Sequence, residues 1–180
     1  MTLYRKLLVA ALCISFSTVS NAQLEVAHLS MRTFKATGFG GFFNVSVPVS
    51  DANYATAEAG IGIFTHDEHN VVVLPLVGGY RFTLDRSGTG FYLEPHAGFA
   101  FGGSDIQRYG PNDLAVYNNG KPVYQKVSGP VAGLGFGYLF EPSGPVQFNL
   151  GIRYQHIFAE SGENMFSIRI SHAFTFGRRE

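Results

Sequence analysis

The sequence predicts an all-β protein, an eight-stranded antiparallel transmembrane β-barrel preceded by a cleaved signal peptide. Residues 146–176 alternate apolar and polar side chains on both sides of a polar turn, and a period of two is typical of β-strands with two unlike faces. The apolar face carries no formal charge, whereas the polar face mixes arginine with glycine and short amides. That pairing of faces is expected when the outside of a barrel meets lipid and its inside is polar.

Residues 1–22 have the three parts of a secretory signal peptide. Arg5 and Lys6 form the charged start, residues 7–16 are apolar, and Ser20-Asn21-Ala22 is a small-residue cleavage site. We therefore expect an outer-membrane β-barrel domain over residues 23–180. The only cysteine, Cys13, would leave with the signal, which excludes a disulfide framework in the exported chain.

The composition also favours a membrane barrel. Charged residues make up 14% of the chain, against roughly 25% in ordinary soluble domains. Loss of Arg5 and Lys6 leaves 11 basic against 13 acidic residues, a net charge of about −2. The sequence contains no stripe of basic residues, so nucleic acid is not an expected partner. A soluble lipocalin-type carrier is the rival architecture, but its outer face would need many lysines and glutamates.

Eight alternating segments follow, an even number as a single-chain antiparallel barrel needs. The expected strands cover residues 25–34, 39–49, 54–65, 71–84, 91–101, 124–140, 146–155 and 166–176. The first sets Ala27, Leu29 and Met31, expected toward lipid, against a polar row that includes Arg32. A tight turn is expected after it, at residues 36–38.

Each later segment sets an aliphatic or aromatic row against a polar one. The third, fourth and fifth place Glu58, Arg81 and Glu94 on their polar rows. The sixth alternates aromatic residues with glycine, and the seventh and eighth place Arg153 and Arg169 opposite uncharged apolar rows. These rows predict one lipid face and one lumen face for the whole barrel.

The connections have the lengths that this architecture requires. If both termini lie in the periplasm, the turns at residues 50–53, 85–90 and 141–145 are periplasmic and short. The one long loop, residues 103–123, then lies outside the cell, as expected for barrels with short periplasmic turns and longer external loops.

Two neighbouring segments carry a family resemblance. The runs at residues 73–82 and 90–101, joined by a short turn, resemble the middle hairpin of the small outer-membrane β-barrel superfamily, which contains OmpA-type, OmpX-type and opacity-type barrels. The resemblance implies a location in the cell outer membrane, an internal charge cluster, and recognition of an aromatic last strand by the barrel-insertion machinery. Phe174 and Phe176 are similar to that terminal signal, and residues 177–180 depart from it.

The lumen of an eight-stranded barrel is just wide enough for side chains, so charges enclosed there are expected to pair. The expected structural cluster is Arg32, Glu58, Arg81, Glu94, His96, Arg153 and Arg169. We expect Glu58 and Glu94 each to bridge at least two arginines and so close the lumen. A proton path, a small pore or a catalytic pair is the alternative.

The long loop is the expected contact surface, because tyrosine offers a large amphipathic area. Its candidate residues are Tyr109, Tyr117, Asn118, Asn119 and Tyr124. The alternative is a loop that only closes the barrel mouth. We therefore expect a monomeric, non-enzymatic protein without a cofactor, with a structural or surface-interaction role toward a partner that the sequence does not name. A small-solute channel and a lipid A-modifying hydrolase are the alternative functions.

Two motifs are expected to carry no chemistry. His66-Asp67-Glu68-His69 offers metal-ligand types, but adjacent residues on a tight turn rarely converge on one ion, so a solvated turn is favoured. The lipid A deacylases have a nucleophilic serine two residues after a histidine, whereas Phe158 stands two residues after His156. Ser161 lies in the turn, where no base would be held beside it.

Overall fold

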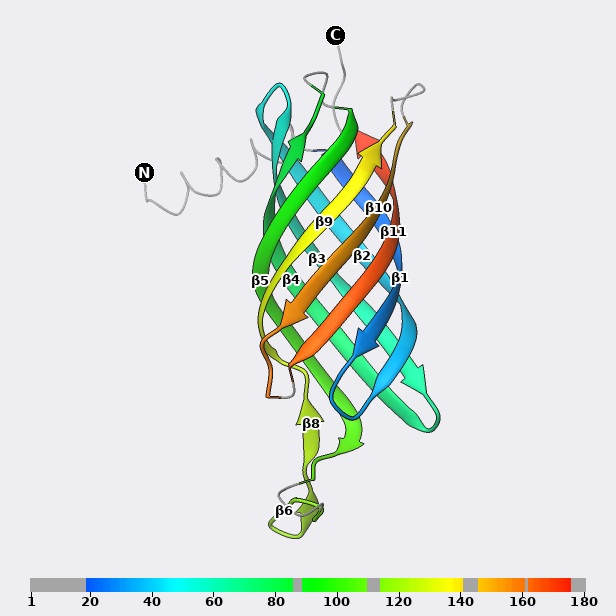
Figure 1. Cartoon of the computed structure of the whole chain (residues 1–180), viewed down its shortest axis with the longest axis vertical. Coiled ribbons are helices and arrows are strands. Elements are labelled where there is room, and N and C mark those ends of the chain that lie inside the picture. Colours follow the sequence, from blue (N-terminus) through cyan, green and yellow to red (C-terminus); the bar gives the residue numbers. More distant parts are fainter. Residues whose placement is uncertain (1–18, 86–88, 110–113, 141–145, 161, 176–180) are drawn as a thin grey trace, which may run out of the picture.

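The protein is a closed antiparallel β-barrel (Figure 1) in a computed structural model that describes residues 19–85, 89–109, 114–140, 146–160 and 162–175. Its wall consists of β1 (Val19–Ser30), β2 (Lys35–Ser50), β3 (Asn53–His66), β4 (His69–Thr83), β5 (Gly90–Gln107), β9 (Gly129–Leu139), β10 (Val146–Ile157) and β11 (Glu163–Thr175). Each wall strand pairs with its neighbour in sequence, and β1 closes the barrel against β11. The predicted eight-stranded fold is confirmed.

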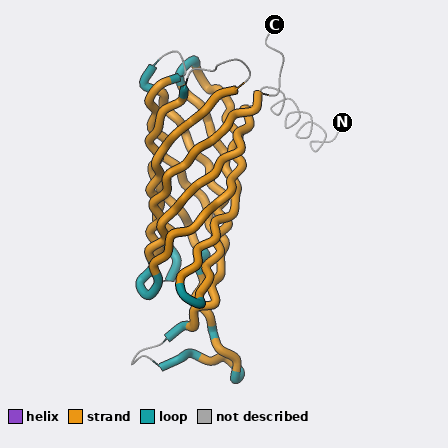
Figure 2. Tube along the Cα trace, turned by 90° about the vertical axis from the view of Figure 1, so that its right-hand side faces the viewer, coloured by secondary structure: helices purple, strands orange, loops and turns teal. Residues whose placement is uncertain are grey.

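The two ends of the barrel differ (Figures 1 and 2). The start of β1 and the end of β11 lie at one end, which we call the terminal end, together with the short turn at residues 51–52. The opposite end, which we call the loop end, carries the turns at residues 31–34 and 67–68 and the long connection between β5 and β9. The long connection therefore lies at the end opposite the termini and the turn at residues 51–52, as the sequence predicts.

Apolar side chains cover the outside of the wall. Leu76, Phe136, Leu150, Ile152 and Ile168 are all exposed, and they come from β4, β9, β10 and β11. The residues between them in sequence point inward and are buried or are glycines. Among the described residues no helix is long and apolar enough to cross a membrane.

The first strand differs from its prediction in position and in facing. β1 ends at Ser30, and the turn occupies residues 31–34, where Met31 N donates to Phe34 O at 2.7 Å. Ala27, Leu29 and Met31 are buried inside, whereas Leu24 and Val26 are exposed outside. The expected turn at residues 36–38 is wrong, because those residues belong to β2. The facing of β1 is the reverse of the expected one because the lumen is apolar near the loop end. An apolar row in that region therefore does not identify the lipid face.

The sixth expected strand and the long loop also have different limits. β5 continues to Gln107, so the connection outside it covers residues 108–123, which we call the long loop from here on. The expected strand at 124–140 is divided into β8 (Tyr124–Lys126) and β9, and β8 pairs with the far end of β5. Within the long loop, β6 (Tyr117–Asn118) and β7 (Lys121–Pro122) form a separate ribbon.

Residues 1–18, which contain most of the predicted signal peptide, lie outside the described residues. Signal cleavage therefore stays a prediction. Cleavage after Ala22 would shorten β1 to residues 23–30, which keep their pairing with both β2 and β11.

Candidate functional site

Six charged side chains form one chain of ion pairs across the lumen. Their order is Arg81, Glu94, Arg169, Glu58, Arg153 and Glu25, and each comes from a different strand. Arg81 Nε lies 2.6 Å from Glu94 Oε2, and Arg153 Nη2 lies 2.6 Å from Glu25 Oε1. Because three arginines alternate with three glutamates, the chain is neutral as a whole, which is what burial in a narrow lumen demands.

Two glutamates join the parts of this chain. Glu94 Oε2 contacts Arg81 and also lies 3.4 Å from Arg169 Nη2. Glu58 Oε1 contacts Arg153 Nη1, and Glu58 Oε2 lies 3.6 Å from Arg169 Nη1. Each glutamate thus meets two arginines, the arrangement expected from the sequence, and all five of these side chains are nearly inaccessible.

Glu25 is a member that the sequence prediction missed. It is 2% exposed and lies beside Gln23, whose Nε2 donates to Glu25 Oε1 at 2.9 Å and to Glu58 Oε2 at 3.0 Å. The inverted facing of β1 hides this residue in the sequence. The alternation from Gln23 through Glu25 to Ala27, all buried, is the signal that could have identified it.

Two predicted members of the cluster lie elsewhere. Arg32 is exposed in the turn at residues 31–34 and takes no part in the ion pairs, so its expected lumen position is corrected. The cause is again the facing of β1 and the earlier end of that strand. His96 is buried and its Nδ1 lies 3.3 Å from the backbone oxygen of Glu94, so it borders the cluster without an ion pair.

Aromatic rings and glycines make the space for the arginines. The Arg81 guanidinium carbon lies 4.7 Å from the centre of the Tyr92 ring, and the Arg153 guanidinium carbon lies 5.4 Å from that of Phe42. A Cβ at Gly137 would lie 2.5 Å from Tyr92 Oη, which is too close for any larger residue. Guanidinium stacking on rings adds attraction at such distances, so these residues hold the charged chain in place.

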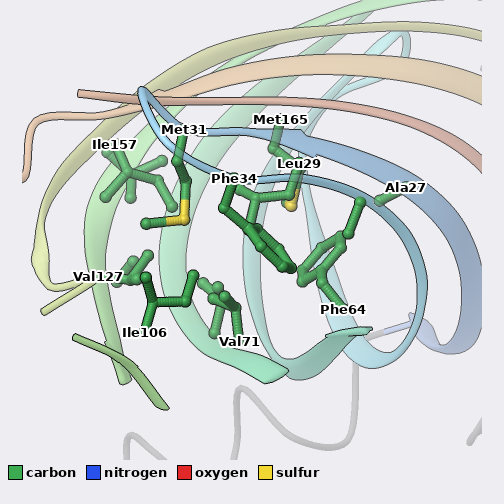
Figure 3. Packing of buried hydrophobic residues seen from close by; sticks show 14 of the residues in the cluster. Ala27, Leu29, Met31, Phe34, Phe64, Val71, Ile106, Val127, Ile157 and Met165 are labelled. Carbon is green, nitrogen blue, oxygen red and sulfur yellow. The ribbon is translucent and has the colours of Figure 1, made fainter. Parts of the chain in front are cut away.

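A second, apolar layer fills the lumen between the ion pairs and the loop end (Figure 3). Its members point toward one another from the wall and the turns; those labelled in the figure are Ala27, Leu29, Met31, Phe34, Phe64, Val71, Ile106, Val127, Ile157 and Met165. On β10, Ile157 follows Arg153 toward the loop end, and on β3, Phe64 follows Glu58 in the same direction. This layer was not predicted from the sequence, because every inward face was expected to be a polar row.

The long loop extends beyond the barrel as a narrow ribbon (Figures 1 and 2). Backbone bonds hold its base, where Arg108 N donates to Val123 O at 2.8 Å and Val116 N donates to Arg108 O at 2.9 Å. Asn119 and Gly120 join β6 to β7 with φ angles of 51° and 76°, the left-handed pair that a type I′ hairpin turn requires.

All five residues named from the sequence for the contact surface are exposed. Tyr109, Tyr117, Asn118 and Asn119 lie in the long loop, and Tyr124 follows it as the first residue of β8. Leu114, 69% exposed, adds an apolar side chain that the sequence analysis did not name. Arg108 Nη1 lies 3.0 Å from Glu160 Oε2, and Gln125 Nε2 donates to Thr33 Oγ1 at 3.0 Å. These contacts tie the base of the ribbon to two neighbouring turns.

The two remaining motifs lie at the loop end. His66, Asp67, Glu68 and His69 are all exposed around the β3–β4 turn, and no group of three metal-ligating side chains occurs within the described part of the chain. His156 Nδ1 lies 3.0 Å from Asn164 Oδ1, and Ser161 lies outside the described residues.

These features define a class of protein: a small closed β-barrel with an apolar outer belt, a filled lumen and one long connection at the loop end. No family model and no curated protein sequence matches the chain. Solved structures with the same fold include Neisserial surface protein A, 11% identical with a TM-score of 0.65, which covers 89% of this chain and 97% of its own.

Two further solved structures share the fold. Ail, the attachment invasion locus protein of Yersinia pestis, is 9% identical with a TM-score of 0.59 and covers 87% of this chain and 97% of its own. The N-terminal barrel domain of Pseudomonas aeruginosa OprF is 19% identical with a TM-score of 0.53 and covers 88% of this chain and 98% of its own. At these identities the comparisons establish the architecture, which is that of the eight-stranded outer-membrane barrels.

Proposed function

We propose that this chain is a non-enzymatic, non-conducting protein of the cell outer membrane that contacts surface partners through its long loop. The observation that carries the proposal is the ribbon beyond the barrel, with Tyr109, Leu114, Tyr117 and Tyr124 all exposed. Tyrosine offers a large amphipathic area and Leu114 an apolar one, on a base held by backbone hydrogen bonds, and such side chains are well suited to contact another surface. Proteins of this fold named for the cell surface and for attachment give further support.

The filled lumen favours a barrel that does not conduct and argues against a channel. A solute would have to break the ion pairs of Glu58 and Glu94 and then cross the apolar layer around Phe64. The contact of His156 with Asn164 likewise supports a structural role for that histidine over a role as the base of a hydrolase. Outer-membrane lipid and the barrel-insertion machinery are the partners that this proposal requires, and a monomer is sufficient for it.

Fractionation tests the location. We expect the protein in the outer-membrane fraction, with heat-modifiable electrophoretic migration, because the outer belt is apolar and continuous. Recovery as a freely soluble protein in periplasmic extract would contradict the membrane assignment.

Adhesion tests the loop. Cells that display the native chain are compared with cells that carry Tyr109→Ser, Tyr117→Ser and Tyr124→Ser together, on epithelial monolayers and for aggregation with one another. The matched control is Tyr80→Ser with Tyr138→Ser, since both tyrosines belong to the wall strands β4 and β9. We expect the loop variant to lose the contact while the control keeps it; equal adhesion by all three would refute the loop as the contact surface.

A further inference from the structure

A groove crosses the outer wall at the loop end, between β4 and β5. It is lined by Asn70, Val72 and Leu74 on β4 and by Gly102, Gly103, Ser104 and Asp105 on β5, and its volume of about 560 Å³ is largely open to the outside. The groove is independent of the long loop and of the lumen layers.

The missing side chain of Gly103 creates this groove. Gly103 alternates with the outward-facing Phe101 and Asp105 and has Val72 as its partner on β4. No heavy atom lies within 4 Å of the place where a Cβ would stand at Gly103. Below the gap, Leu74 and Phe101 belong to the exposed apolar belt, so the groove opens into the lipid-facing surface.

A carboxylate is fixed at the polar end of the groove. Asp105 Oδ1 accepts from Asn70 N at 2.8 Å, and Asp105 Oδ2 accepts from Asn70 Nδ2 at 3.2 Å. His69 Nδ1 lies 3.3 Å from Asp105 Oδ1. These contacts orient the carboxylate while its side chain remains 44% exposed, and a carboxylate has room for further donors.

A lysine lies on the strand at the other side of the gap. Lys126 on β8 is the direct partner of Gly103, and directly opposed residues of an antiparallel pair project to the same face. Lys126 is exposed and forms no ion pair within the described residues. Asp105 is two residues from Gly103 on β5, in the stretch between Gly103 and Gln107 where the register with β8 is irregular, so Asp105 and Lys126 both lie next to the gap at Gly103.

We propose that this groove binds a phospholipid with a zwitterionic headgroup. The lipid ammonium donates to Asp105, the lipid phosphate accepts from Lys126, and an acyl chain runs along Leu74 and Phe101. The negative charge of Asp105 and the positive charge of Lys126 lie beside the empty space at Gly103, at the border of the apolar belt. This arrangement matches a ligand that carries a positive charge, a negative charge and an acyl chain. Charge-assisted hydrogen bonds of this kind are about twice as strong as neutral ones.

Native mass spectrometry of the detergent-purified barrel tests the site. The probes are phosphatidylethanolamine, phosphatidylcholine, whose quaternary ammonium has no N–H to donate, and phosphatidylglycerol, which has no cation. We expect retained adducts with phosphatidylethanolamine, at an affinity on the order of tenfold above that of the other two lipids. Equal retention of the three lipids would overturn the proposal.

Variants separate the site from general lipid coating. Gly103→Leu fills the groove and should abolish the retained adduct, whereas Asp105→Asn should reduce binding of phosphatidylethanolamine to the level of phosphatidylcholine. Lys126→Gln should weaken the binding of all three phospholipids. The matched control is Gly41→Leu on β2, where an outward Cβ also meets no atom within 4 Å, and it should bind as the native chain does. If Gly103→Leu and Gly41→Leu retain lipid equally, the groove is not the site.

Discussion

The balance of the lumen charges determines which single residues matter most for stability. Glu94 stands between Arg81 and Arg169, so its removal leaves three arginines facing two glutamates. An uncompensated charge in a buried cluster is strongly destabilising, because it has neither water nor a partner. We expect Glu94→Ala to lower the free energy of unfolding by about 3–5 kcal/mol, measured by urea denaturation of the barrel in detergent micelles.

The double replacement of Arg81 and Glu94 by Met and Leu provides the comparison. It removes the end of the chain and leaves Arg169, Glu58, Arg153 and Glu25 in alternating order, so the remaining cluster is neutral and the loss should be smaller. Glu160→Ala is the surface control, because Glu160 pairs with Arg108 in an exposed position and exposed pairs contribute less than about 1 kcal/mol. A double variant less stable than Glu94→Ala would show that charge balance is not the controlling term.

At the scale of elements, the facing of seven of the eight strands was predictable, although the sixth is shorter than expected, and the facing of the first was wrong for a physical reason. Strands such as β10 and β11 have one charged or polar row and one apolar row, so alternation alone identifies the lipid face. In β1 each row changes character along the strand. The inward row passes from Gln23 and Glu25 to Ala27 and Leu29, while the outward row passes from Leu24 and Val26 to His28 and Ser30. The same ambiguity hid Glu25 and placed Arg32 wrongly. The alternation of residues 27–32 alone does not resolve it, since the answer there depends on what the other strands contribute to the lumen.

The facing of β1 can be measured with a single tryptophan, because the chain contains none. Leu24→Trp should give blue-shifted emission that brominated lipids quench, since Leu24 is 74% exposed on the outer wall. Leu29→Trp should escape quenching, since Leu29 is fully buried in the lumen. Efficient quenching at position 29 and none at position 24 would restore the facing predicted from the sequence.

The outer belt makes a separate prediction for β10. Leu150 lies in the middle of that strand and faces outward. Leu150→Lys should lower the free energy of unfolding in lipid vesicles by roughly 2–4 kcal/mol, whereas Thr37→Lys, which faces outward near the loop end, should lower it by about 0–1 kcal/mol. Equal losses at the two positions would mean that Leu150 does not lie near the centre of the bilayer.

The whole molecule combines two barriers of different chemistry in one lumen. The sequence predicted the ionic barrier, because arginines and glutamates on inward rows had to meet in a narrow barrel. It did not predict the apolar barrier, because that barrier is assembled from single residues on many strands and turns, such as Met31, Phe64, Val127 and Ile157. The alternation within single strands is enough to predict the outer belt, whereas predicting the apolar barrier also requires the register between the strands.

Two barriers in series predict how conductance responds to substitution. The native barrel should show no steady conductance in planar bilayers. Glu94→Ala should also stay closed, because the apolar layer remains, and Met31→Ser with Phe64→Ser should stay closed, because the ion pairs remain. Only the combination of all three substitutions weakens both barriers, so it alone should conduct. Heat-modifiable migration of each variant shows that it is folded before it is measured. A steady conductance in the native barrel, or in Glu94→Ala alone, would mean that the apolar layer does not seal the lumen and would favour the small-solute channel.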